Sequence, residues 1–194
     1  MSAIKSISPV PRCIAFLRAI NVGGHTVKME KLKKLFEALG FSKVETFIAS
    51  GNVIFDSSSR EVGALEKKIE AHLKKSLGYE VSTFIRSSSE LAEIAAYRPF
   101  PESELAKSHA LYVGFLQAPV SAEAKKKLLA AESKIDRFHF HGRELYWLLS
   151  ASSIKETKFS GPLLEKTLRA PTTLRNITTV RKLTEKYGNK EVKT

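Results

Sequence analysis

Two patterns of hydrophobic spacing alternate along the first 86 residues, and their order limits the possible folds more than any other feature. Short, mainly apolar runs indicate strands, whereas apolar residues three or four positions apart indicate amphipathic helices. The expected strands cover residues 13–20, 44–49, 52–56 and 81–86, and the expected helices cover 27–39 and 61–77. Thr26 is the expected N-cap of the first helix, which should stop at Gly40, and Gly78 should end the second. The order β-α-β-β-α-β is the split β-α-β, or ferredoxin-like, pattern.

A second set of elements follows in nearly the same order. Strands are expected at 109–116, 135–140 and 144–149, and helices at 121–133, 162–168 and from Asn176 to Tyr187. Ser121 and Asn176 are the expected caps of the first and last of these helices. The second half is therefore expected to read β-α-β-β-α plus an extra helix, without a fourth strand. The fold class predicted from this order is α+β, with two ferredoxin-like halves that arose by duplication and an extra C-terminal helix. The predicted organisation is a flexible tail at 1–12, a first half at 13–86, a linker with a short helix at 87–108, and a second half at 109–194.

The first expected strand is apolar on both of its faces. One face presents Ile14, Phe16 and Ile20, and the other presents Cys13, Ala15, Leu17 and Ala19. A sheet with one face in water alternates apolar and polar residues instead. We therefore expect the second half to cover the face that the helices leave open, so that both halves share one core and fold as one unit.

Polar and glycine-rich turns are expected to converge at one edge of the first sheet. The first two strands should run parallel, because a right-handed helical crossover joins them, and both then end at that edge. The turn after the first strand holds Asn21, Gly23, Gly24 and His25, and the hairpin after the second holds Ser50, Gly51 and Asn52. Such convergence predicts a ligand pocket, although tight turns alone also explain these residues. Arg18 is expected either in an ion pair or on a bound anion.

The charge of the chain favours an anionic partner. Lys and Arg number 32 against 20 Asp and Glu, for a formal net charge of +12. Residues 1–29 hold four of the excess positive charges, and residues 150–194 hold six. If the two ends meet, they form a basic surface for phosphates or nucleic acid. The alternative is that these lysines and arginines are only solvated surface.

Several classes of function leave no trace in the sequence. No apolar run approaches the ~20 residues that span a membrane, and no secretory signal is present, so a cytoplasmic protein is expected. The glycine turn lacks the G-x-G-x-x-G and Gly-Lys-Ser/Thr patterns of nucleotide sites. His139 and His141 make only a weak metal site without a third ligand, so no metal is predicted and the cofactor is unknown. The single Cys13 is expected to be a buried small side chain.

Three functions remain open at this stage. The first is a binding protein for a phosphate-bearing small molecule or nucleic acid. The second is an enzyme acting on a small anionic metabolite, with His25 or Ser50 moving a proton. The third is an interaction domain in which the turns are purely structural. Oligomeric state is not predicted.

The sequence resembles the bacterial domain-of-unknown-function family 1697. The resemblance spans residues 13–187 and rests on the segments 17–24, 39–41, 50–53, 99–100, 175–176 and 179–180, together with Met29, Thr46 and Thr173. It implies an α+β protein with duplicated ferredoxin-like halves, and it implies no activity. This chain has Ala19 where the family usually has glycine, and Ile177 where it often has tryptophan.

The later signature of this family, Arg175 and Asn176, precedes the last expected helix. A helix N-terminus carries positive potential. One hypothesis is therefore that Arg175, Asn176 and the turn at 21–25 bind one anionic group, such as a phosphate. The alternative is that Arg175 and Asn176 join the two halves by bonding to backbone carbonyls.

Overall fold

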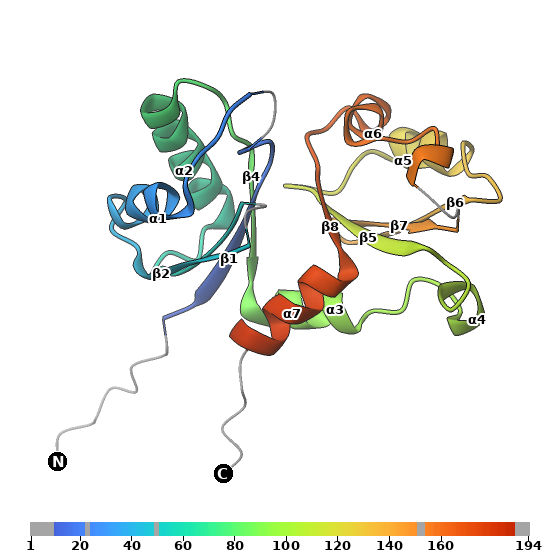
Figure 1. Ribbon diagram of the computed structural model, residues 1–194, viewed down its shortest axis with the longest axis horizontal. Helices are drawn as coiled ribbons and strands as arrows, with labels where there is room; N and C mark the ends of the chain where they lie inside the picture. Colours follow the sequence, from blue (N-terminus) through green and yellow to red (C-terminus); the bar gives the residue numbers. More distant parts are fainter. Residues whose placement is uncertain (1–9, 22–23, 49–50, 151–153, 189–194) are drawn as a thin grey trace, which may run out of the picture.

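The computed structural model describes residues 10–21, 24–48, 51–150 and 154–188, and in them it has a mixed α+β architecture. Two four-stranded antiparallel sheets and seven α-helices make up this part of the chain (Figure 1). The first sheet has the order β2-β3-β1-β4. Its strands are β1 (Arg12–Leu17), β2 (Ser42–Phe47), β3 (Asn52–Asp56) and β4 (Thr83–Ser87). Helices α1 (Met29–Glu37) and α2 (Val62–Leu77) cover one of its faces.

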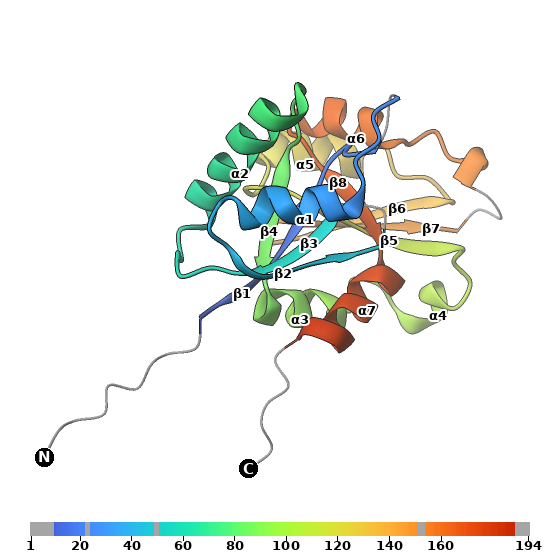
Figure 2. The ribbon, with the colours of Figure 1, turned by 60° about the vertical axis from the view of Figure 1, so that its left-hand side comes forward.

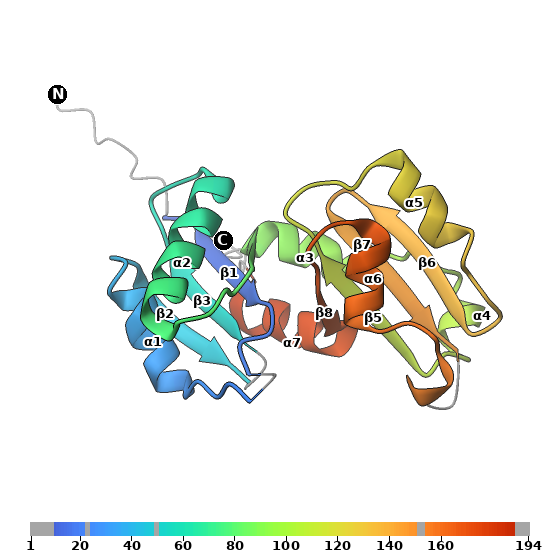
Figure 3. The same cartoon turned by 90° about the horizontal axis from the view of Figure 1, so that it is seen from above.

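The second sheet has the order β6-β7-β5-β8 (Figure 3). Its strands are β5 (Ala110–Phe115), β6 (Asp136–His141), β7 (Glu144–Leu149) and β8 (Thr173–Asn176). Helices α5 (Ala122–Leu129) and α6 (Gly161–Leu168) cover its outer face. The remaining elements are α3 (Ser88–Ala96), α4 (Glu102–Leu105), the 3-10 turn η1 (Ile154–Glu156) and α7 (Ile177–Tyr187).

Several sequence expectations are wrong in detail. The second half was expected to lack a fourth strand, but β8 pairs with β5 from Thr173 to Asn176. Thr26 was the expected N-cap of the first helix, but α1 begins at Met29 after Lys28 and has no side-chain cap. The Asn21 side chain instead accepts the Val27 N–H at 2.7 Å, so the loop before α1 is held by the turn that precedes it.

A hydrophobic core lies between the two sheets, as the apolar second face of β1 predicted. Phe16 of β1 stacks on Phe115 of β5 with ring centroids 3.9 Å apart. Helices α3 and α7 close this shared core from one side, which Figure 2 shows. Separate clusters lie under α1 and α2 and under α5 and α6. Alternate residues of β1 therefore contact the first half's helices and the second half.

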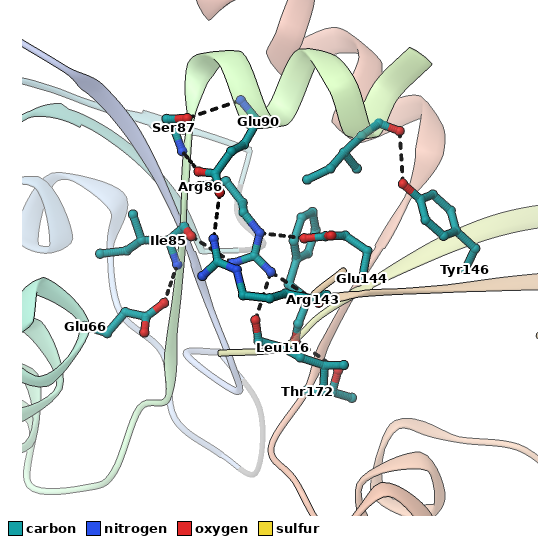
Figure 4. Close-up of polar contacts among 12 residues, drawn as sticks. Glu66, Ile85, Arg86, Ser87, Glu90, Leu116, Arg143, Glu144, Tyr146 and Thr172 are labelled. Carbon is teal, nitrogen blue, oxygen red and sulfur yellow. Dashed lines mark hydrogen bonds and ion pairs between the residues drawn. The ribbon is translucent and has the colours of Figure 1, made fainter. Parts of the chain in front are cut away.

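A buried ion pair also joins the halves. Arg86 of β4 donates to the Glu144 carboxylate of β7 at 2.6 Å, and its side chain is only 1% exposed. The same guanidinium donates to the backbone carbonyls of Leu116 and Arg143 in the second half (Figure 4). The contact between halves is thus polar as well as apolar, and it leaves Arg86 fully enclosed.

Candidate functional site

The end of β1 and the hairpin after β2 meet at one edge of the first sheet, as the turn analysis predicted. Strands β1 and β2 both run antiparallel to β3, and the Leu17 N–H donates to the Gly51 carbonyl at 2.8 Å. Gly51 and Asn52 therefore lie directly beside the end of β1. Gly23 and Ser50 of the predicted site lie outside the described residues.

Gly51 is required by both its backbone conformation and its surroundings. Its φ is +75°, and a Cβ there would lie 2.6 Å from Ile20 Cγ2. We expect Gly51→Ala to lower the free energy of unfolding by about 1–3 kcal/mol, measured by urea denaturation. The matched control is Gly63→Ala in α2, where a Cβ has open space. That substitution should stabilise by about 0.5–1 kcal/mol, and an equal loss in both variants would contradict a special role for Gly51.

A second residue at this edge has a backbone conformation that glycine adopts more easily. Ala19 has a φ of 59°, which lies in the left-handed region where a Cβ is unfavourable. A glycine would adopt this conformation without strain, and the alanine shows that the chain tolerates a methyl group there. Strand β1 ends at Leu17, two residues before this turn in the backbone.

Arg175 joins β8 to the first half. Its Nε donates to Asn52 Oδ1 at 2.7 Å, and Nη2 donates to the Leu17 carbonyl at 3.1 Å. Nη1 donates to Thr173 Oγ1 within β8 itself. The residue is 8% exposed, and burial lowers the pKa of its guanidinium to about 10. These are the contacts expected of a residue that holds the two halves together.

Arg18 makes a second connection across the same boundary. It donates through two nitrogens to the two carboxylate oxygens of Glu165 on α6, with 2.5 Å between Nη2 and Oε2. Glu165 also accepts the Thr172 N–H at 2.9 Å. Arg18 was expected either in an ion pair or on a bound anion, and the structure contains the ion pair with Glu165.

The remaining residues of the predicted turn are held locally. His25 is exposed and its ring stacks on Tyr79 with centroids 3.8 Å apart. The Tyr79 hydroxyl donates to the Ile20 carbonyl at 3.0 Å. Gly24 has a φ of +86° with open space around it. This part of the loop is therefore fixed against Tyr79, in the segment between α2 and β4, rather than against Arg175.

Asn176 lies apart from its neighbour Arg175, because successive residues of a strand point to opposite faces. Its Oδ1 accepts the Thr178 N–H at 2.9 Å and so caps α7, as the sequence predicted. Asn176 also lines a cavity of about 370 Å³ at the start of α7. We call this the α7 cavity; its polar and charged lining residues are Arg98, Glu102, Ser108, His109, Asn176, Thr178 and Arg181. Sequence reasoning identified only Asn176 among them.

His139 and His141 of β6, which were considered as metal ligands, both contact Tyr97 at the C-terminal end of α3. The Tyr97 hydroxyl lies 2.9 Å from His139 Nε2, and its ring stacks on His141. Burial, together with the nearby His141, lowers the pKa of His139. Within the described ranges, no group of three His, Cys, Asp or Glu is placed to hold a metal ion. Cys13 is buried, which raises the pKa of its thiol to about 11.

Comparisons with known proteins give a family and a fold. A family model described as "Protein of unknown function (DUF1697)" matches residues 10–146. A solved structure of the conserved bacterial protein SP0830 from Streptococcus pneumoniae aligns with a TM-score of 0.73 and 23% identity, over 91% of this chain and 98% of that chain. No curated protein matches the sequence. In the part of the chain that the structure describes, no helix has the length and apolarity to cross a membrane.

Proposed function

The chain belongs to the DUF1697 family of proteins of unknown function, and we propose that it binds a phosphate-bearing small molecule in the α7 cavity. The observation that carries the proposal is the concentration of cationic and donor groups there. Arg98, His109 and Arg181 come from three separate segments and line one cavity. Glu102 is the one carboxylate among the lining residues, so the cavity is complementary to an anion.

Most side-chain donors in this cavity keep hydrogen-bonding capacity, although the Ser108 hydroxyl donates to the Leu105 carbonyl at 2.7 Å. Among the described residues, the side chains of His109 and Arg181 have no hydrogen bond or ion pair, and Arg98 makes one bond, to the Ala96 carbonyl. Asn176 uses its Oδ1 on the Thr178 N–H. The start of α7 adds the positive potential of a helix N-terminus. A phosphate oxygen would therefore meet guanidinium, amide and hydroxyl donors together.

The lining of the cavity favours a compact ligand over nucleic acid. Recognition of single-stranded nucleic acid relies on aromatic side chains on which bases stack. No Phe, Tyr or Trp belongs to the lining of the α7 cavity. A volume of about 370 Å³ is at the small end for ligand pockets. A nucleoside monophosphate or a phosphorylated metabolite fits these properties better than an oligonucleotide.

The polar turn after β1 takes a supporting part in this proposal. The hydrogen bond between Arg175 and Asn52 holds β8 in place, and Asn176, which follows Arg175, lines the α7 cavity. Loss of the Arg175 contacts would displace the start of α7. Of the site predicted around residues 21–25 and 50–52, Asn52 would therefore act through Arg175, by positioning Asn176.

We also infer that the two halves are ferredoxin-like units that arose by duplication. The inference is supported by the matching strand orders of the two sheets, each with two helices on one face. A helix from each half's end, α3 and α7, then completes the shared core.

A thermal-shift series tests the binding proposal. Inorganic phosphate, adenosine monophosphate and a twelve-nucleotide oligo-dT are each titrated into the protein at constant ionic strength. A ligand at about a hundred times its Kd should add about 2.7 kcal/mol, which is on the order of 5–10 °C for a chain of this size. The shift with phosphate or the nucleotide should disappear in the Arg98→Gln/Arg181→Gln double variant and persist in Lys182→Gln, which changes an exposed α7 residue outside the lining.

Three other outcomes would redirect the proposal. A shift that survives the double variant would place the ligand elsewhere. A shift with oligo-dT alone that falls steeply with salt would favour the nucleic-acid hypothesis. No shift with any probe would reject anion binding and leave the interaction domain as the working hypothesis.

A further inference from the structure

A second cavity lies against α5 and α6, the outer helices of the second half, and shares no lining residue with the α7 cavity. It has a volume of about 750 Å³ and is bordered by the end of α5, the turn before β6, the segment after η1, and α6. We call it the α5–α6 cavity. Figure 3 shows these two helices together on the outer face of the second sheet.

The wall of the α5–α6 cavity is largely apolar. Ala130, Ala131, Ile135, Phe159 and Leu163 contribute to it. Leu163 is 37% exposed, one of only four large hydrophobic residues described as exposed. Exposed apolar surface that borders a cavity is an unfavourable contact with water, which an apolar ligand would remove.

The cavity carries a net positive rim once internal pairs are considered. Lys127, Lys134 and Lys158 are exposed and line it, and none of them has an ion pair among the described residues. Of the lining carboxylates, Glu132 accepts the Phe138 N–H at 2.6 Å and pairs with Arg137. The remaining carboxylates are Asp136 and Glu156.

Asp136 faces inward rather than toward a ligand. It is 2% exposed, and its Oδ1 accepts the Trp147 Nε1–H at 2.9 Å and the Thr157 hydroxyl at 2.6 Å. The buried charge is thus satisfied by donors behind the wall. Three ammonium groups therefore line the mouth, and Glu156 is the one lining carboxylate besides Glu132 and Asp136.

From this combination we propose that the α5–α6 cavity binds a small organic acid, with an apolar body against Phe159 and Leu163 and a single carboxylate at the lysine rim. Lysine stems extend the apolar wall while their ammonium groups stay in water. The cavity is of the size that holds drug-sized ligands. This site is independent of the α7 cavity, so either proposal can fail without the other.

Trp147 provides a direct reporter for this site. It is the only tryptophan in the chain. Its indole bonds to Asp136 and lies 6.3 Å from the Phe159 ring, both of which line the cavity. Octanoate is the probe, since it has an apolar body and one carboxylate; 1-octanol has the same body without charge, and acetate has the charge without the body.

Equilibrium dialysis with labelled octanoate, followed in parallel by Trp147 emission, tests the proposal. We expect saturable binding of one octanoate, at least tenfold weaker binding of 1-octanol, and no binding of acetate. Leu163→Asp should weaken octanoate at least tenfold, whereas Leu129→Asp should change it less than twofold. Leu129 is the matched control, because it is 41% exposed on α5 and does not line the cavity.

A second set of variants tests whether the lysine rim binds the carboxylate. Lys134→Gln/Lys158→Gln should reduce octanoate affinity to that of 1-octanol, and Lys126→Gln, outside the lining, should leave it unchanged. Far-UV circular dichroism confirms that each variant is folded. If dialysis detects no bound octanoate, or if Leu163→Asp and Leu129→Asp lose the same octanoate affinity, the proposed site is wrong. Equal affinity for octanoate and 1-octanol would overturn the carboxylate assignment.

Discussion

Replacing Arg86 with methionine is expected to lower the free energy of unfolding by about 3–5 kcal/mol, a large part of the stability of a typical domain. The guanidinium is 1% exposed and donates to Glu144 and to the carbonyls of Leu116 and Arg143. Methionine fills part of the space but donates nothing. Glu144, whose side chain is 9% exposed, would keep a buried charge without its partner. Guanidinium chloride denaturation measures the loss.

The size of this effect comes from the charge left behind, which a second substitution isolates. The double variant Arg86→Met/Glu144→Met removes both charges, so it should recover a substantial part of the loss. The matched control is Arg137→Met. Arg137 pairs with Glu104 and Glu132 at the surface, where these three side chains are 44%, 37% and 28% exposed. An exposed pair contributes about 0–1 kcal/mol, and equal losses for Arg86 and Arg137 would contradict this account.

Elements with strong local signals were predictable from the sequence. The apolar spacing of Leu65, Ile69 and Leu73 marked α2, and these residues are buried against the first sheet. Gly78, with a φ of +85°, ends the helix where a glycine was expected. Ser121 and Asn176 cap the helices that the sequence assigned to them. In each case the information lies within a few neighbouring residues.

Elements that depend on a distant partner were not predictable in this way. Strand β8 has only four residues, Thr173–Asn176, and it becomes a strand because β5 pairs with it. The end of β1 came earlier than expected, since Ala19 turns the chain at positive φ. Helix α5 ends at Leu129, before a turn in which the Ser133 hydroxyl accepts the Asp136 N–H. Hydrophobic periodicity carries no information on any of these contacts.

The same distinction applies to the candidate site. The turn around Asn52 and the cap at Asn176 were recognisable, since each has a short polar pattern. Whether Arg175 reaches a ligand or Asn52 depends on how the two halves meet, and it donates to Asn52. Arg98 and Arg181 are 83 positions apart in the numbering and share no motif. Their convergence on one cavity follows from the packing of α7, which no local pattern encodes.

Replacing Phe16 with alanine is expected to cost about 3–5 kcal/mol. The ring is fully buried, stacks on Phe115, and lies under the Arg175 guanidinium at 5.7 Å. Its removal would open a cavity in the core that both halves share. Trp147 lies in the second half and does not belong to that core. Its fluorescence therefore reports whether damage in the first half reaches the second.

Leu73→Ala makes this test sharper, because Leu73 belongs to the cluster under α1 and α2, entirely within the first half. It should cost about 2–5 kcal/mol. If the halves unfold together, the Trp147 transition should move by the same free energy as the far-UV circular dichroism signal, in both variants. If the halves unfold separately, Leu73→Ala would leave the Trp147 midpoint unchanged. A shared core, a buried ion pair and two arginine connections between the halves all favour the single transition, because neither half can open without exposing the Phe16–Phe115 stack and the Arg86 charge.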